Sequence, residues 1–325
     1  MEDPSYRTVL LDLINWKDER FAITSYLSSP LLDQSLERWG MLAPPWLWDT
    51  GEAGCTIVDG FKRLAWARDR RLSSARCLVF PQESDFQRLM LLRLETKLCS
   101  LALNVAEKAQ VLAALVRCAL SENILQEYLP RLHLPARREV IGPWCRLAAS
   151  PSRLLQSAAL GTVCERAALV LADWEDDARN EGLAILEQLR CSASIQMEIL
   201  EHVSEIALRE GKPKVTVLTD PTVTGLLQDR HSNHRQKTQA LRTALTRMRF
   251  PRLAAREMEF RETLARANLP GSIRLLPPPA FEGDGWQLTL SFSNPHELRR
   301  VLPKATAFAS SPLLEEILGK KGGSS

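Results

Sequence analysis

The sequence lacks any apolar run of about 18 residues, the length that a membrane-crossing helix requires. The segment Met1–Asp18 mixes acidic with apolar residues and lacks the basic-then-apolar order of a secretory signal peptide. The seven cysteines include no C-x-x-C pair, and no cysteine pair lies near His231 and His234 in the sequence. We therefore expect a cytoplasmic protein with reduced, mostly buried thiols, no metal site and no membrane partner.

A strong net charge is also lacking, because 42 basic and 39 acidic residues leave a formal charge of only +3. The charge is nevertheless unevenly distributed. Residues 1–96 hold 12 basic and 14 acidic side chains, residues 97–210 hold 12 and 15, and residues 211–325 hold 18 and 10. The net charge of +8 in the last third indicates a polyanionic partner for that part of the chain.

The order of the apolar patterns predicts an α+β protein with three parts. Strand patterns at 8–14, 44–48, 55–59 and 75–80 are interspersed with helix patterns at 29–40 and from 60 onwards, which predicts an α/β N-terminal domain over 1–97. Helical patterns then continue to residue 208, with breaks at prolines and at Gly161, so we expect an all-helical domain over 98–210.

The last third predicts a small, basic α+β module over 211–318. Its helix pattern covers 237–268, its strand pattern covers 287–292, and a short helix pattern covers 295–302. The Gly/Ser/Lys-rich tail over 319–325 is expected to be disordered.

One turn carries the strongest chemical signal in the first domain. A strand pattern ends at Asp59, Gly60 permits a tight turn, and Lys62 and Arg63 then fall in the first turn of a helix. A helix N-terminus offers free N–H groups and a positive dipole end, and two cations there would complete a phosphate site. A solvated helix start is the alternative interpretation of the same residues.

The order of elements around this turn resembles the ParB/sulfiredoxin-like N-terminal domain of bacterial partition proteins. That family has a "S-I-x-x-x-G-x-L-x-P" helix and strand, and the segment Ser35–Pro44 here reads SLERWGMLAP. Its "G-E-R-R-x-x-A" turn is matched by Gly60–Ala67, GFKRLAWA. Its "L-N-P-x-E-E-A" segment is matched by Leu103–Ala109, LNVAEKA, and its helix-turn-helix is similar to residues 120–149.

The resemblance covers roughly residues 8–210 and implies a DNA-binding protein of chromosome or plasmid partition or of nucleoid organisation. It also implies a homodimer that binds CTP with Mg²⁺ at Gly60, Lys62 and Arg63 and acts with a ParA-like ATPase. The family's "E-N-x-x-R", which holds metal and phosphate, aligns here with Thr96–Ser100, TKLCS, and is therefore missing. CTP and Mg²⁺ thus follow from the resemblance as a whole and not from this segment.

Two basic clusters are the candidates for contact with double-stranded DNA. The first surrounds the segment that resembles a helix-turn-helix, where Arg137 and Arg138 are expected in the first turn of a second helix over 136–149 that Gly142-Pro143 would interrupt. The second covers 230–256, which has eight basic residues and no acid. Arginine predominates there, as suits phosphate contact. The candidate residues are Arg131, Arg137, Arg138 and Arg146 in the first cluster and Arg235, Lys237, Arg242, Arg247, Arg249 and Arg252 in the second.

Two other functions remain open from the residues alone. One is an enzyme on the same front fold, a phosphotransferase or nuclease that uses Asp59, Lys62 or Arg63, although no second acid–base group stands at a suitable spacing. The other is a non-catalytic interaction scaffold whose basic helix binds an acidic partner. Retention on duplex DNA that collapses as salt rises would favour DNA binding over both alternatives.

Overall fold

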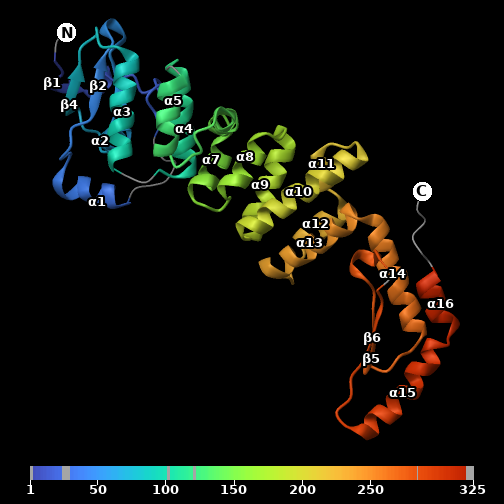
Figure 1. Ribbon diagram of the computed structural model, residues 1–325. Helices are drawn as coiled ribbons and strands as arrows, with labels where there is room; N and C mark the ends of the chain where they lie inside the picture. The colour runs from blue at the N-terminus through green and yellow to red at the C-terminus, as the bar shows by residue number, and fades with distance from the viewer. Residues whose placement is uncertain (1–2, 24–29, 101–102, 120–121, 284, 320–325) are drawn as a thin grey trace.

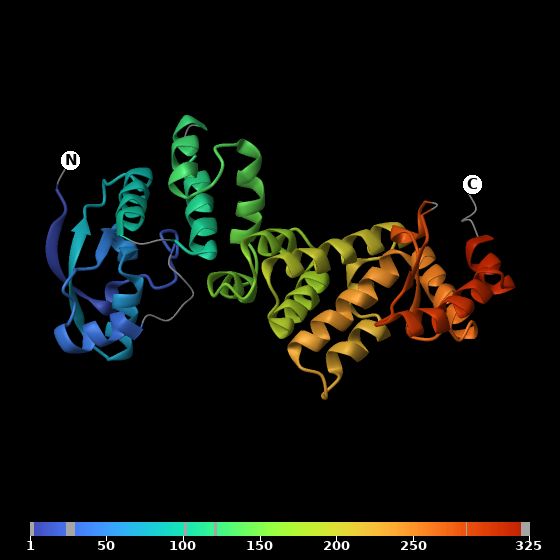
Figure 2. The same ribbon diagram turned by 60° about the horizontal axis from the view of Figure 1, so that its bottom comes forward.

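The computed structural model describes residues 3–23, 30–100, 103–119, 122–283 and 285–319. The described chain is elongated, with a four-stranded sheet at one end, a run of helices in the middle and a small α/β module at the other end (Figures 1 and 2). The predicted mixture of α and β structure is therefore confirmed. No helix within the described ranges is long and apolar enough to cross a membrane.

The sheet consists of β1 (Ser5–Leu10), β2 (Trp46–Asp49), β3 (Cys55–Asp59) and β4 (Ser74–Phe80) in the order β1-β4-β2-β3. β2 runs parallel to β4, and the other two pairs are antiparallel. The first strand pattern ends earlier than expected, because Leu11–Leu13 form a 3₁₀ turn instead of extended strand. The sequence patterns for β3 and β4 predicted their positions to within one residue.

Successive residues of β3 face opposite sides of the sheet, as strand geometry requires. Ile57 packs in the cluster that includes Leu64 of α2 (Phe61–Asp69), whereas Val58 packs in the cluster that includes Met90 of α3 (Phe86–Ser100). The sheet is thus covered by α2 on one face and by α3 on the other. A further helix, α1 (Pro30–Trp39), contacts α2 and ends at Gly40 as predicted.

The middle of the chain is helical, and one continuous apolar cluster extends from α3 to α13. Gln196 helps to join these helices, because its side chain bonds the backbone of Cys164, Thr162 and Cys191. The helices are α4 (Val105–Arg117), α5 (Glu122–Arg131), α6 (Ile141–Ala148), α7 (Ser152–Ala159), α8 (Glu165–Ala172), α9 (Asp176–Leu189), α10 (Ala193–Glu210), α11 (Lys214–Leu218), α12 (Pro221–Gln228) and α13 (His234–Arg249).

The second helix of the segment that resembles a helix-turn-helix differs from the expectation. Arg138–Val140 form a 3₁₀ turn, and α6 begins only at Ile141. Arg137 and Arg138 therefore precede α6 and do not lie in its first turn, which corrects the prediction. Pro143 does not break the helix, because it falls in the first turn, where backbone N–H groups have no intrahelical partner to lose.

The expected helix over 237–268 is two helices, α13 and α14 (Pro251–Arg266), separated at Phe250. Pro251 explains the break, because it has no N–H to donate and restricts the backbone of the residue before it. α13 packs against α10, and α14 leads into the last module. The chain changes direction at this joint in Figure 1.

The last module consists of β5 (Ile273–Leu276), β6 (Gln287–Leu290), α15 (Pro295–Ala309) and α16 (Pro312–Gly319). β5 and β6 form a separate antiparallel sheet. The pattern at 287–292 predicted β6, but β5 was missed, and α15 is longer than the expected 295–302. The tail expected to be disordered falls at 320–325, outside the described residues, while Gly319 ends α16.

Candidate anion-binding sites

The turn between β3 and α2 requires glycine at position 60. Gly60 has φ +89°, a conformation that L side chains rarely adopt, and it caps the N-terminus of α2. A Cβ atom there would lie 2.9 Å from Cβ of Pro45 and 3.0 Å from Nη2 of Arg63. The predicted strand–glycine–helix geometry is therefore present, and it places Asp59, Lys62 and Arg63 around one backbone turn.

Asp59 is held by two arginines from different elements. Nη2 of Arg63 donates to Oδ2 of Asp59 at 2.8 Å, and Nη1 of Arg93 lies 2.8 Å from Oδ1. Arg63 also donates from Nη1 to the carbonyl oxygen of Ala43 at 2.6 Å. The guanidinium group expected to meet a phosphate is thus folded back onto the end of β3.

Arg93 is a charged side chain buried in α3, with only 5% of its surface exposed. Burial lowers the pKa of its guanidinium group, and Asp59 opposes that shift. Its Nε is buried and has no hydrogen-bond acceptor among the described residues. A buried donor without a partner is costly, so this atom marks a place where an additional acceptor would be stabilised.

A second ion pair lies next to this one. Nζ of Lys97, on α3, lies 3.0 Å from Oε1 of Glu107, whose other oxygen accepts from the backbone N–H of Asn104 in the capping box of α4. Burial lowers the pKa of the Lys62 ammonium group, and the positive charge of Lys97 adds to that shift. We call Asp59, Lys62, Arg63, Arg93, Lys97 and Glu107 together the Asp59 cluster.

The Asp59 cluster has four cations and two carboxylates, and the nearby Asp33 carboxylate also acts on Lys62, so the formal excess of positive charge is one. This arrangement favours an incoming anion. Sequence reasoning found Gly60, Lys62 and Arg63 but missed Arg93 and Lys97. A lysine or arginine within an amphipathic helix gives no sequence signal that it will be buried against a strand more than 30 residues away.

The donor set of the Asp59 cluster does not fit Mg²⁺, which prefers carboxylate and other oxygen ligands. Both carboxylates are occupied by arginine or lysine, and Lys97 stands within the segment where the resembled family has its metal-binding motif. Nowhere in the described ranges do three His, Cys, Asp or Glu side chains gather as a metal site would need. Arg93 Nε has no described acceptor, but it is buried, so a phosphate oxygen could reach it only after the surrounding side chains moved.

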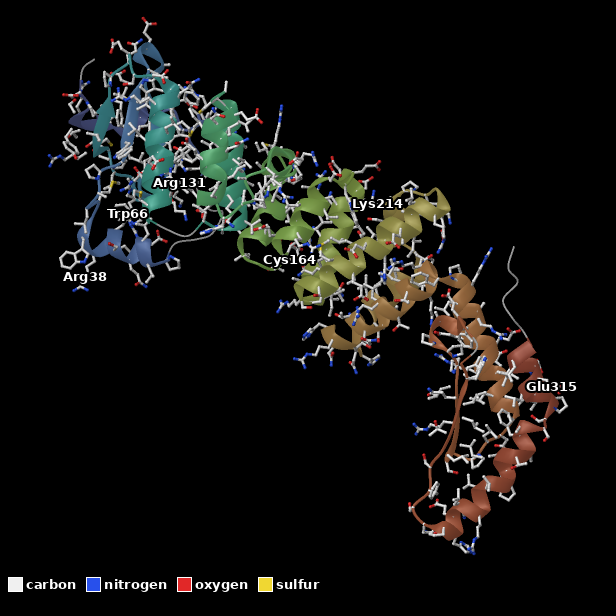
Figure 3. The ribbon with its side chains drawn as sticks, viewed as in Figure 1. Arg38, Trp66, Arg131, Cys164, Lys214 and Glu315 are labelled. Carbon is white, nitrogen blue, oxygen red and sulfur yellow. The ribbon has the colours of Figure 1, made fainter. Side chains whose placement is uncertain are left out.

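The candidate residues of the first basic cluster do not share one role. Arg131, which is labelled in Figure 3, forms two hydrogen bonds to Glu95, at 2.6 and 2.7 Å. Its guanidinium group also lies 5.0 Å from the centroid of the Tyr128 ring. These bonds lower the pKa of Glu95 to about 2. Arg146 pairs with Asp173 at 2.8 Å on the surface, where such pairs contribute little and exchange readily. Arg137 and Arg138 are exposed and form no ion pair within the described chain.

Three of the six candidate residues in 230–256 have partners inside the protein. Arg242 binds Glu198 of α10 through two hydrogen bonds of 2.9 and 2.8 Å, and Arg249 forms an ion pair with Glu205 of the same helix. Nζ of Lys237 donates to the carbonyl oxygen of Leu227 at 2.5 Å. These contacts fasten α13 to α10 and α12, and they were not visible in a charge count along the chain.

The other three, Arg235, Arg247 and Arg252, are exposed and form no ion pair with any described residue. Arg235 and Arg247 border a face of α13 whose other exposed residues are neutral hydrogen-bonding side chains. We call this surface the α13 face and define it as Arg235, Gln239, Thr243, Thr246 and Arg247.

Comparisons with known proteins give distant matches to solved structures alone. No protein-family model and no curated protein matches the chain. One similar structure is C-terminally truncated chromosome-partitioning protein ParB from Caulobacter crescentus, complexed to the centromeric parS site. The identity is 15%, the TM-score is 0.31, and the match covers 60% of this chain and 98% of that one. The same protein complexed with CTP-γ-S matches with 18% identity, a TM-score of 0.26 and coverage of 57% and 98%. At these TM-scores the likeness assigns neither a family nor a function.

Proposed function

We propose that this protein binds double-stranded DNA through the α13 face. The observation that carries the proposal is a helix surface bordered by two exposed arginines that have no acidic partner among the described residues, with glutamine and threonine between them. Arginine suits phosphate contact, and neutral hydrogen-bonding side chains can face base edges without repulsion. Arg137 and Arg138 provide a second exposed basic pair for the phosphate backbone.

Within this proposal, the biological role is the one that the sequence resemblance implies, partition of a chromosome or plasmid or organisation of a nucleoid in a bacterial cytoplasm. A ParA-like ATPase is the corresponding protein partner. The Asp59 cluster would then hold the phosphates of a nucleotide, CTP by resemblance, without Mg²⁺. Its excess positive charge supports that assignment.

A homodimer through the last module also belongs to the proposal. The sheet of β5 and β6 has only two strands, and such sheets are marginally stable without further partners. Leu276, Leu288, Phe292 and Leu302 in this module are exposed, at 42–51% of their surface. A second copy that covers them would bury apolar area and give the edge strands a partner.

DNA binding is tested by measuring the salt dependence of affinity for a random-sequence duplex. Each phosphate contact that is lost should make the slope of log K against log salt shallower by about 0.9. The double variant Arg235→Gln/Arg247→Gln should therefore reduce the slope by about 1.8. The matched control is Arg299→Gln/Lys304→Gln, which removes two exposed positive charges from α15.

The two double variants have equal net charge, so any difference between them reports position. The assignment of the α13 face would be overturned if the α13 variant kept the slope of the parent protein. It would also be overturned if the α15 variant reduced the slope by the same amount as the α13 variant. Titration with CTP and with pyrophosphate, each with Mg²⁺ or EDTA, separately tests the Asp59 cluster. A strict requirement for Mg²⁺ would contradict the donor set described above.

A further inference from the structure

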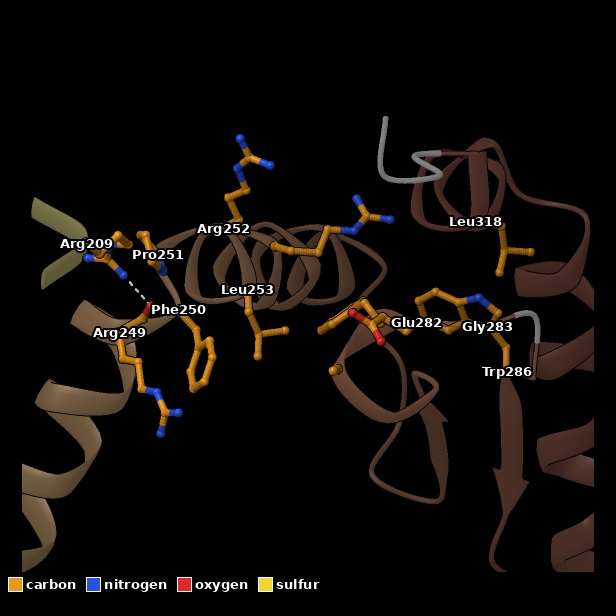
Figure 4. Close-up of a pocket in the computed structure, with 13 residues that line it drawn as sticks. Arg209, Arg249, Phe250, Pro251, Arg252, Leu253, Glu282, Gly283, Trp286 and Leu318 are labelled. Atoms are coloured by element: carbon orange, nitrogen blue, oxygen red, sulfur yellow. Dashed lines mark hydrogen bonds between the residues drawn. The ribbon is translucent and has the colours of Figure 1, made fainter. Parts of the chain in front are cut away.

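The joint between α13 and the last module contains a cavity of about 750 Å³. One side is formed by the residues at the break between α13 and α14, and the other by the 3₁₀ turn Pro279–Phe281 and the start of β6 (Figure 4). Its volume lies within the range of roughly 300–1,000 Å³ that is usual for sites of small organic ligands. Neither the Asp59 cluster nor the α13 face includes this cavity.

The apolar part of the lining comes from both sides of the joint. Phe250 and Leu253 extend from the α13–α14 side, and Trp286 and Leu318 lie across from them in Figure 4. Phe250 and Leu318 are exposed, at 43% and 39% of their surface, although each borders the cavity. Large apolar side chains that remain exposed to solvent around a cavity are typical of a ligand-binding site.

The wall opposite α13 is built from aromatic rings. Phe281 and Trp286 both pack on Phe260 of α14, with ring centroids 5.5 and 5.8 Å from it. The backbone of Ala280 and Phe281 is left-handed, with φ of +53° and +58°, which non-glycine residues adopt only when the surroundings enforce it. The packing thus fixes Phe281 at the edge of the cavity in a conformation that the free chain would avoid.

The charged part of the lining is mostly cationic. It contains Arg209, Arg249, Arg252 and Arg256, and Glu282 is the one carboxylate among the described lining residues. Arg209, Arg249 and Arg256 also form ion pairs with Glu210, Glu205 and Glu259 outside the cavity, so Arg252 is the lining arginine without an ion pair among the described residues. Arg249 lies on the same side of α14 as Phe250 and Leu253, and Arg209 is held by a hydrogen bond to the Arg249 carbonyl oxygen (Figure 4). Arg249 also lies 4.7 Å from the Phe250 ring centroid, so one cation and one aromatic surface are presented together.

We propose that this cavity binds a small organic anion with a flat apolar body, such as an aromatic carboxylate, sulfonate or phosphate ester. The aromatic and leucine side chains would contact the flat body, and the arginines at the rim would contact the acidic group. A ligand of this class would bridge α14 and the turn at Phe281.

Two fluorescent probes with the same ring system test the proposal on the full-length protein. 8-Anilinonaphthalene-1-sulfonate carries one negative charge, and N-phenyl-1-naphthylamine is its neutral counterpart. The sulfonate should bind at one saturable site per chain and at least about tenfold more tightly than the neutral probe. Equal affinity of the two probes would overturn the assignment to an anion.

Variants then place the bound probe. Leu253→Gln should lower the affinity for the sulfonate by about tenfold. Met258→Gln, on the exposed surface of the same helix, should leave this affinity unchanged. Glu282→Gln should raise the affinity for the sulfonate by about threefold and leave the affinity for the neutral probe unchanged, because the substitution removes only a negative charge. Unfolding temperatures equal to that of the parent protein show that each variant is folded. If Leu253→Gln and Met258→Gln bind the sulfonate equally, the cavity is not the site.

Discussion

The two partners of the Asp59–Arg93 ion pair should differ sharply in their contributions to stability. Asp59 retains 17% side-chain exposure and has Arg63 as a second partner, whereas Arg93 retains 5% exposure and has Asp59 as its ion-pair partner within the described residues. Asp59→Asn leaves the buried guanidinium charge without its ion-pair partner, and Glu107 is then a more distant carboxylate that acts on it. Loss of one member of a buried pair costs about 3–5 kcal/mol, and the remaining amide oxygen places this variant near the lower value, about 3 kcal/mol.

Arg93→Met should cost much less, about 1 kcal/mol, because it removes the buried charge and its unpaired Nε while Asp59 keeps its bond to Arg63. The double variant Asp59→Asn/Arg93→Met should then be more stable than Asp59→Asn alone, since the uncompensated charge is gone. The ranking of the three variants is therefore the prediction, more than any single value.

The assay is urea-dependent hydrogen exchange, read by mass spectrometry on peptides from β3 and α3. A single midpoint for a multidomain chain would mix transitions of different parts, whereas exchange reports the opening free energy of the segment concerned. Peptides from α9 and α10, which make no contact with Asp59, serve as an internal reference. The charge-burial argument would be refuted if Asp59→Asn and Arg93→Met lowered the opening free energy of β3 and α3 equally. It would also be refuted if the double variant were less stable than Asp59→Asn.

Three further predictions concern stability. Gly60→Ala should destabilise the first domain by about 2 kcal/mol, because the backbone at φ +89° is strained for alanine and the new Cβ would contact Pro45. Gly161→Ala should cost only about 1 kcal/mol, because Gly161 has φ +75° but no atom within 4 Å of a new Cβ. Thermal unfolding of both variants measures the difference. The pKa of Glu95 is lowered from 4.5 to about 2. Its bonds to Arg131 therefore stabilise the fold fully above about pH 4.5, and this stabilisation is lost as the pH falls towards 2. In Arg131→Gln, the unfolding temperature should depend less on pH between 4.5 and 2. Asn104→Ala removes the capping box of α4 and should cost about 1 kcal/mol in urea unfolding, with no such loss in Asn104→Asp.

The sequence predicted those parts of the fold that local chemistry determines. The strand pattern at Cys55–Asp59 and the glycine at 60 identified the end of β3 and the start of α2. Helix boundaries were less accurate where a proline had two possible effects. Pro251 ends α13, as its missing N–H requires, but Pro143 is accommodated in the first turn of α6. Which effect applies depends on where the helix begins, and tertiary packing decides that.

The candidate sites depended more on contacts that are distant in the sequence. The segment 230–256 has no acid of its own, yet Glu198 and Glu205 of α10 neutralise Arg242 and Arg249. A local charge count therefore overstated the cationic surface of α13. The same limitation hid Arg93, because its partner Asp59 lies 34 positions earlier and is reached only when α3 packs against β3.

Under the proposal that the α13 face binds DNA, the spacing of its two arginines determines how the helix would meet a groove. Arg235 and Arg247 are 12 residues apart, which corresponds to about 18 Å along a helix axis. The major groove of B-DNA is about 12 Å wide, so two cations at this separation extend beyond both of its edges when the helix lies across it. Gln239 and Thr243 lie between them and would then face the groove without adding a repulsive charge. The ion pairs of Arg242 and Arg249 with α10 support this geometry, because they fix the rotation of α13 about its axis and so determine which residues remain exposed.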